Sequence, residues 1–93
     1  MPQPDGEAAK AIMEADPEAR QAMIEGMVDR LARRLEENGD DLEGWLRLAR
    51  ARSVLGDREA AADALDRAAE RFAGDETASA RIESMRAELG LGS

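Results

Sequence analysis

The sequence contains no cysteine, no histidine and no tyrosine, and its aromatic residues are one tryptophan and one phenylalanine. The absence of cysteine excludes disulfides, thiolate nucleophiles, cysteine zinc sites and iron–sulfur clusters. The absence of histidine removes the commonest general base and the commonest transition-metal ligand, so a serine has no usual base to activate it. These gaps argue against an enzyme, and we expect no cofactor.

Long apolar runs and a positive charge balance are missing as well. Thirteen basic residues stand against 21 acidic ones, which gives a formal net charge of −8. That charge opposes binding to a nucleic-acid backbone or an anionic membrane. No stretch approaches the roughly 18 apolar residues of a membrane span, and no signal-peptide core is present. We therefore expect no nucleic-acid partner and no membrane insertion by this chain.

The length and the alanine content indicate a small helical domain. Ninety-three residues allow one domain, and a chain of this size buries only about 60–65% of its unfolded surface. Alanine contributes 19 residues to the apolar fraction. A core rich in alanine requires close contact between backbones, which paired helices with small side chains provide.

Proline, glycine and aspartate divide the chain. Residues 1–15 are interpreted as a tail or linker, and a helical domain is expected over residues 16–91. Asp16 precedes Pro17 in the arrangement of an N-cap and a first helical residue. Four glycines stand where a left-handed helix end is expected, and the first three precede a capping aspartate: Gly39, Gly56, Gly74 and Gly90. The predicted helices are 17–38, 42–55, 58–73 and 76–89, with antiparallel neighbours.

Residues 42–75 fit one tetratricopeptide unit, a helix–turn–helix repeat of 34 residues. With Leu42 as the first position, packing residues fall where the unit needs them: Trp45, Leu48, Ala49, Ala61, Leu65 and Ala68. The predicted helix 17–38 aligns as the second helix of a preceding repeat. The predicted helix 76–89 aligns as the first helix of a following repeat. The expected fold is all-α, with antiparallel helical hairpins forming one full tetratricopeptide-like repeat between two half repeats.

Three consecutive motifs carry a resemblance to a known family. Residues 26–35 are GMVDRLARRL, residues 37–48 are ENGDDLEGWLRL, and residues 54–56 are VLG. In this order they resemble the periplasmic repeat domain of the CcmI/CycH-type cytochrome c biogenesis proteins, over roughly Asp16 to Leu91. Two positions depart from the family pattern. Gly39 stands where the family usually has proline, and Arg52 stands where the repeat usually has tyrosine.

The resemblance implies a non-catalytic role. Such proteins are membrane-anchored, with their repeat domain in the periplasm. They hold unfolded apocytochrome c, chiefly by its C-terminal helix, and pass it to the haem-ligation machinery. The family therefore implies a periplasmic location and a helical peptide as partner.

Tetratricopeptide units present the first helix of each pair to a concave groove. The outward positions of the helix 42–55 are Glu43, Leu46, Arg47, Arg50, Ser53 and Val54. Apolar residues of an amphipathic helix could lie on Leu46 and Val54, with its carboxylates on the arginines. The alternative is that Leu46 packs on a neighbouring helix and the arginines are solvated or paired with Glu43.

Other candidates have simpler structural explanations. Trp45 occupies a packing position, so we expect it in the core and not as a ligand platform. Met27 and Met85 are expected to fill core gaps, whereas Met23 is an exposed candidate for adaptable binding. Three arginines form a basic cluster that is either a solvated helix face or an accessory contact for an acidic partner: Arg30, Arg33 and Arg34.

Two hypotheses for the function remain open. The first is a module that binds a helical peptide, by resemblance an apocytochrome c. The second is a structural interaction module in which exposed Leu46, Val54 and Met23 form a homodimer or bind a neighbouring protein of an assembly.

Overall fold

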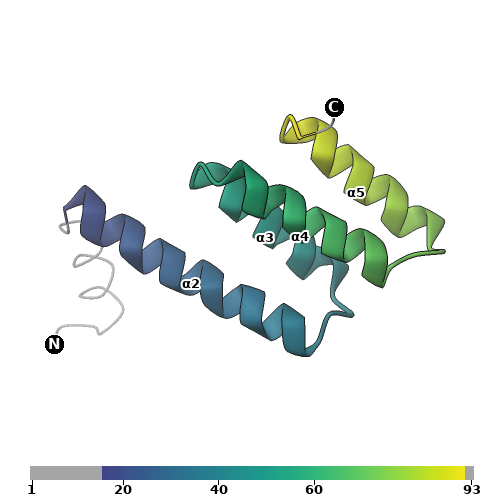
Figure 1. Ribbon diagram of the computed structural model, residues 1–93, viewed down its shortest axis with the longest axis horizontal. Coiled ribbons are helices and arrows are strands. Elements are labelled where there is room, and N and C mark those ends of the chain that lie inside the picture. The colour runs from purple at the N-terminus through teal and green to yellow at the C-terminus, as the bar shows by residue number, and fades with distance from the viewer. Residues whose placement is uncertain (1–15, 92–93) are drawn as a thin grey trace, which may run out of the picture.

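The computed structural model describes residues 16–91 as four α-helices without a strand in that range (Figure 1). The helices are α2 (Pro17–Glu37), α3 (Leu42–Val54), α4 (Arg58–Arg71) and α5 (Glu76–Glu88). Each predicted boundary lies within two residues of the observed one, which confirms the all-α prediction. The predicted tail, residues 1–15, lies outside the described residues.

Each helix begins at an aspartate that caps it. The carboxylates of Asp16, Asp41, Asp57 and Asp75 each accept a hydrogen bond from the backbone N–H three residues ahead, at 2.8–3.0 Å. Such a bond satisfies an N–H that the helix itself leaves unpaired. The four aspartates therefore fix where the helices start.

Three of the four glycines expected at helix ends adopt the left-handed conformation, and the fourth does not. Gly56, Gly74 and Gly90 have φ of +84°, +90° and +70°, a conformation that glycine adopts without steric cost. The same expectation for Gly39 is wrong, because its φ is not positive. Gly39 is instead buried, and its carbonyl oxygen accepts a hydrogen bond from the Trp45 indole N–H at 2.9 Å.

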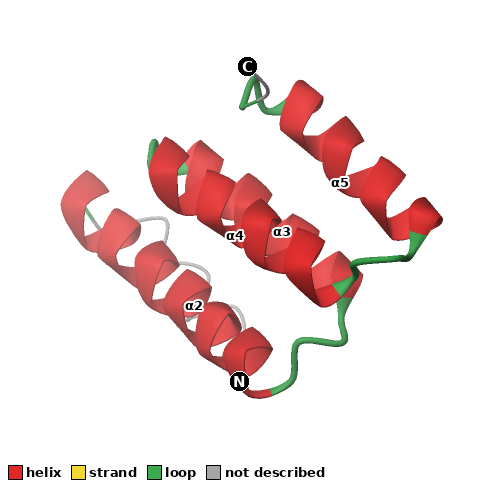
Figure 2. Ribbon diagram, turned by 45° about the vertical axis from the view of Figure 1, so that its right-hand side comes forward, coloured by secondary structure: helices red, strands yellow, loops and turns green. Residues whose placement is uncertain are grey.

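The 34-residue period is visible in the backbone. α3 and α5 both have 13 residues, and their first residues, Leu42 and Glu76, are 34 positions apart. The C-caps of α2 and α4, Asn38 and Phe72, show the same separation. Figure 2 shows the helices as an antiparallel stack in which α3 and α4 lie together between α2 and α5. The chain thus forms one tetratricopeptide-like hairpin flanked by two half repeats.

The core is centred on the contact between α3 and α4, the most extensive helix pair. Four alanines of this pair are at most 2% exposed: Ala49, Ala61, Ala64 and Ala68. Leucine and isoleucine side chains fill the space around them, and the largest fully buried ones are Leu35, Leu65 and Ile82. Small residues at the crossing let the two backbones approach, as the sequence predicted.

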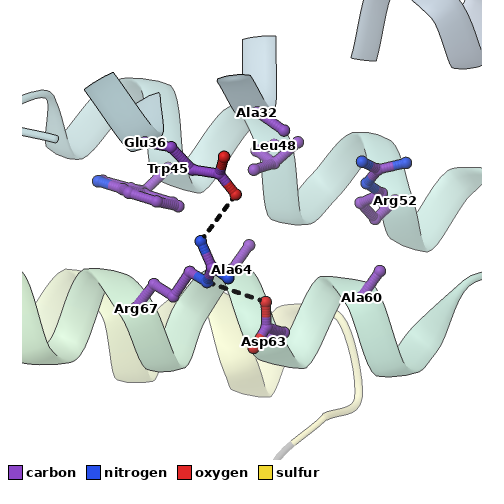
Figure 3. Close-up of a pocket in the computed structure, with 9 residues that line it drawn as sticks. All are labelled: Ala32, Glu36, Trp45, Leu48, Arg52, Ala60, Asp63, Ala64 and Arg67. Atoms are coloured by element: carbon purple, nitrogen blue, oxygen red, sulfur yellow. Dashed lines mark hydrogen bonds and ion pairs between the residues drawn. The ribbon is translucent and has the colours of Figure 1, made fainter. Parts of the chain in front are cut away.

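Trp45 is 5% exposed and belongs to this core, as expected from its position in the repeat. Its ring borders a cavity of about 110 Å³ between α2, α3 and α4, which Leu48 and Ala64 also line (Figure 3). The hydrogen bond from its indole to Gly39 ties α3 to the end of α2. Trp45 therefore packs and positions the backbone.

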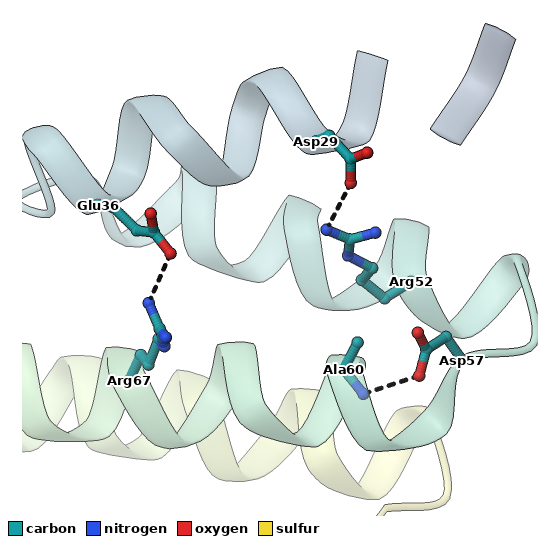
Figure 4. Close-up of polar contacts among 6 residues, drawn as sticks. All are labelled: Asp29, Glu36, Arg52, Asp57, Ala60 and Arg67. Carbon is teal, nitrogen blue, oxygen red and sulfur yellow. Dashed lines mark hydrogen bonds and ion pairs between the residues drawn. The ribbon is translucent and has the colours of Figure 1, made fainter. Parts of the chain in front are cut away.

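Ion pairs on the protein surface join α2 to the hairpin formed by α3 and α4, which we call the central hairpin. Arg52 of α3 contacts Asp29 at 3.0 Å, and Arg67 of α4 contacts Glu36 at 3.0 Å (Figure 4). Exposed pairs of this kind stabilise a protein by at most about 1 kcal/mol each. Arg52, which replaces the usual tyrosine of the repeat, thus forms an ion pair with the preceding helix.

The first half of α2 is not packed as the sequence predicted. Met27 was expected in the core, but it is 61% exposed. Val28 and Leu35 occupy the buried stripe of α2, and Met27 lies on a different side of the same helix. The end of α3 reaches the first turns of α2, where Val54 and Leu55 line a hollow with Ile24. Met27 is therefore exposed because it lies on a side of α2 that α3 does not cover.

Two helical glycines provide a matched test of this packing. A Cβ built on Gly44 lies 2.7 Å from Leu35 Cδ2 and 2.6 Å from Asp41 Oδ2, whereas one built on Gly26 meets nothing within 4 Å. We expect Gly26→Ala to raise the free energy of unfolding by about 0.5–1 kcal/mol, because alanine favours the helix. Gly44→Ala should lower it by about 1–3 kcal/mol through overpacking. Urea unfolding followed by circular dichroism measures both, and equal effects would contradict the packing described.

Candidate functional site

A hollow of about 350 Å³ lies between α3 and α5. Four of the residues that line it come from α3 and were predicted from the repeat positions, and two come from α5: Glu43, Leu46, Arg47, Arg50, Arg81 and Met85. A second hollow of about 380 Å³ shares Leu46, Arg81 and Met85 with the first. We call the two together the α3–α5 groove.

The floor of the groove is apolar and its borders are charged. Leu46 is 4% exposed and Met85 is partly buried against the core, whereas Glu43, Arg47 and Arg50 are exposed. Leu46 was expected to face outward, and this expectation is wrong because α5 packs beside it. The alternative weighed from the sequence, in which Leu46 packs on a neighbouring helix, describes its position.

The six residues predicted to face outward from α3 do not all lie together in the structure. Val54 is 81% exposed and lines a separate hollow with Ile24 of α2. Ser53 is partly buried and lines neither hollow of the groove. Only the first four members of the row therefore lie together with α5.

The accessory candidates also lie away from the groove. Met23, Arg30 and Arg34 are exposed residues of α2, and none of them lines either hollow of the groove. α2 and α5 flank the α3–α4 pair from different sides (Figure 2). These three residues therefore form a separate surface.

Two ion pairs connect the walls of the groove. Glu43 of α3 pairs with Arg81 of α5, and Arg50 of α3 pairs with Glu88 of α5 at 2.6 Å. The Arg50 guanidinium also lies 3.8 Å from the sulfur of Met85. Arg47 makes no salt bridge within residues 16–91. It is the groove arginine whose donors remain open to a ligand carboxylate.

The pairing changes the acidity of the Glu43 carboxyl group. A hydrogen bond from Arg81 lowers the pKa of Glu43 below its ordinary value of 4.5, and the charges of Arg81 and Arg47 act in the same direction. The same hydrogen bond raises the pKa of Arg81. Glu43 therefore keeps its negative charge, and its bond to α5, down to a lower pH than an isolated glutamate.

Sequence reasoning missed the half of the groove that α5 supplies. Arg81 and Glu88 follow Arg47 and Val54 by 34 residues, and Ala80 follows Leu46 by the same interval. The outward positions of one repeat thus predict those of the next. Applying the repeat to α5 as well as to α3 would have identified Ala80, Arg81, Ser84 and Glu88, which all line the second hollow.

The arrangement suits reversible contact with an apolar and charged surface. Over residues 16–91, no group of three or more acidic side chains is placed to hold a metal ion. Within the same range, no helix is both long enough and apolar enough to cross a bilayer. What the groove offers chemically is an apolar floor, an unpaired guanidinium and two exchangeable ion pairs.

The chain is similar to two curated proteins, each named cytochrome c-type biogenesis protein CycH. It is 52% identical over 68 residues to the protein of Bradyrhizobium diazoefficiens, which covers 73% of this chain and 18% of that protein. It is 43% identical over 84 residues to the protein of Rhizobium meliloti, which covers 90% of this chain and 21% of that protein. The chain thus spans about a fifth of the length of these relatives. No family model and no solved structure matches it.

Leu46 and Val54 lie on the same helix, but Leu46 is buried and Val54 is exposed, so substitutions of the two test the packing of α3. We expect Leu46→Ala to lower the free energy of unfolding by about 2–4 kcal/mol, because it removes buried apolar atoms between α3 and α5. Val54→Ala should change it by no more than about 0.5 kcal/mol, because the side chain is exposed. Chemical unfolding of both variants measures the difference. A negligible cost for Leu46→Ala would show that Leu46 is an outward residue after all.

The pKa of Glu43 tests the link between the groove walls. In Arg81→Gln the hydrogen bond is lost, so we expect the pKa of Glu43 to rise toward 4.5 in a carboxyl NMR titration. A lowered pKa in the folded state stabilises the protein above the unfolded pKa, and this contribution disappears as the pH falls through the folded pKa. The stability difference between Arg81→Gln and the unchanged protein should therefore vanish at low pH. As a control, Arg71→Gln breaks the pair with Asp40 and should leave the pKa of Glu43 unchanged.

Proposed function

This chain is of the CcmI/CycH type found among cytochrome c biogenesis proteins, and on that basis we propose that it is a non-catalytic peptide-binding module. In this proposal it holds unfolded apocytochrome c, by its C-terminal helix, during c-type cytochrome maturation. The observation that carries the proposal is the α3–α5 groove. Glu43, Leu46, Arg47 and Arg50, predicted from the repeat alone, converge there with residues of α5.

The groove has the chemistry that an amphipathic helix requires. Leu46 and Met85 provide an apolar floor, and methionine adapts its flexible side chain to differently shaped partners. Arg47 has no salt bridge in the described part of the chain, so it can receive a carboxylate of the bound helix. Arg50 and Arg81 can do so only by exchanging their present partners, Glu88 and Glu43.

A groove made by two helices is short, which limits the affinity. Binding must offset the ordering of the peptide and the rupture of existing ion pairs, so we expect a dissociation constant of about micromolar or weaker. The relatives extend far beyond the matched segment. In the proposed setting, further parts of such a protein add affinity, anchor it in the membrane with this domain in the periplasm, and pass the cytochrome to the haem-ligation machinery.

A second candidate function is a structural interaction module. Large apolar side chains that are exposed and lie outside the groove favour it: Met23, Ile24, Met27 and Val54. A homodimer or a neighbouring protein of the assembly would cover them. The two functions use different faces, so they can be tested separately.

Reversing one unpaired charge tests the peptide-binding proposal. The ligand is a fluorescein-labelled peptide that covers the C-terminal helix of an apocytochrome c, and a scrambled peptide of the same composition controls for charge alone. We expect saturable binding in fluorescence anisotropy, weakened about five- to tenfold by Arg47→Glu. Arg33→Glu is the matched control, because Arg33 is also exposed and unpaired in the described range but lies on α2. It should leave the affinity within about twofold of the unchanged protein.

Two results would contradict the proposal. Equal binding of the scrambled peptide would mean that charge and not helical pattern is recognised. Equal weakening by Arg47→Glu and Arg33→Glu would mean that the peptide does not bind in the α3–α5 groove.

A further inference from the structure

The first half of α2 holds three of the four large apolar side chains that are exposed in the described part of the chain. Three large apolar side chains there are 40–61% exposed: Met23, Ile24 and Met27. Soluble surfaces tolerate single exposed apolar residues, but a cluster of them marks an interaction site. The proposed peptide-binding groove, between α3 and α5, does not use these residues.

Two methionines and two arginines lie along one stripe of α2. Met23, Met27, Arg30 and Arg34 are separated by four, three and four residues, which places them on the same side of a helix. All four are exposed. We call them the α2 stripe. Its first half is apolar and its second half is basic.

The positions on α4 that are equivalent to this stripe are covered by another helix, so they provide a comparison. Ala61, Ala64 and Ala68 follow Met27, Arg30 and Arg34 by 34 residues, and all three are at most 2% exposed in the central hairpin. α2 carries long side chains at the same positions. A helix therefore cannot approach the α2 stripe as closely as α3 approaches α4. A partner must lie farther away, where methionine and arginine side chains can fill the space.

The arginines of the α2 stripe form no ion pair among the described residues, although the chain as a whole is acidic. Every arginine from Arg50 to Arg86 contacts a carboxylate or a carbonyl oxygen. Arg30 and Arg34 make no salt bridge with any residue in the range 16–91. Two neighbouring guanidinium groups that no ion pair holds within this range can bind carboxylates of a partner.

We propose that the α2 stripe is the docking site of an acidic amphipathic helix. Apolar residues of that helix contact Met23 and Met27, and its carboxylates bind Arg30 and Arg34. A second copy of this chain fits poorly. In a parallel pair of α2 helices each arginine of the stripe would face its own copy. In an antiparallel pair centred between the methionines, Arg30 would face Arg20.

The probe is a synthetic helical peptide of about 20 residues, long enough to hold helical structure on binding. Along one face it carries leucines in one half and glutamates in the other. A second peptide has the two halves exchanged, so that both orientations are tested. Fluorescence anisotropy of each labelled peptide is measured with the full 93-residue chain. We expect one of the two to bind saturably.

Matched charge changes locate the binding. Arg30→Glu with Arg34→Glu should weaken binding at least about tenfold, since two favourable charge contacts become repulsive. Arg33→Glu lies on α2 outside the stripe and Arg47→Glu lies in the groove, so each should leave the affinity within about twofold. A peptide with lysines in place of the glutamates should bind the doubly reversed variant better than the unchanged protein. Circular dichroism verifies that each variant folds.

Four outcomes overturn the proposal. In the first, neither peptide binds. In the second, Arg33→Glu weakens binding as much as the double reversal, which would mean that only net charge matters. Alternatively, light scattering gives twice the monomer mass for the unchanged protein and the monomer mass for Met27→Glu, so that a second copy covers the stripe. Loss of binding in Arg47→Glu alone would assign the peptide to the groove and also count against the stripe.

Discussion

The close approach of α3 and α4 is the constraint on which the rest of the structure depends. Ala49, Ala61 and Ala68 have no exposed surface, and a larger side chain at any of them would separate the two backbones. The chain has few aromatic residues to fill a wider gap. The positions of α2 and α5 follow from this pair, because each packs on a surface that the central hairpin has already shaped.

Features encoded by neighbouring residues were predictable, and features decided by a distant partner were not. Asp41 and Asp57 cap their helices by bonds that span three residues, so the sequence predicts them directly. The burial of Trp45 follows from the spacing of the repeat. By contrast, the exposure of Met27 depends on whether another element covers its side of α2. The burial of Leu46 depends on α5, which lies more than thirty residues ahead along the chain.

For the same reason, the sequence predicted only the half of the candidate site that α3 contributes. The outward positions of α3 identify Glu43, Arg47 and Arg50, because helical periodicity determines which residues share a face. Their partners Arg81 and Glu88 become apparent when the 34-residue period is extended to α5. Gly39 shows the opposite case. The conformation expected of a glycine at a helix end is overridden by burial and by the hydrogen bond from the Trp45 indole.

The position of α5 has a consequence for the thermodynamics of recognition. α5 contributes one wall of the groove, and its contact with the central hairpin is much less extensive than that between α3 and α4. Local unfolding starts where few buried contacts resist it. When α5 detaches, the groove no longer exists, so a ligand that binds both walls stabilises the attached state by mass action. Ligand binding to the groove and docking of α5 are then coupled. The apparent affinity is reduced in proportion to the fraction of molecules in which α5 is docked.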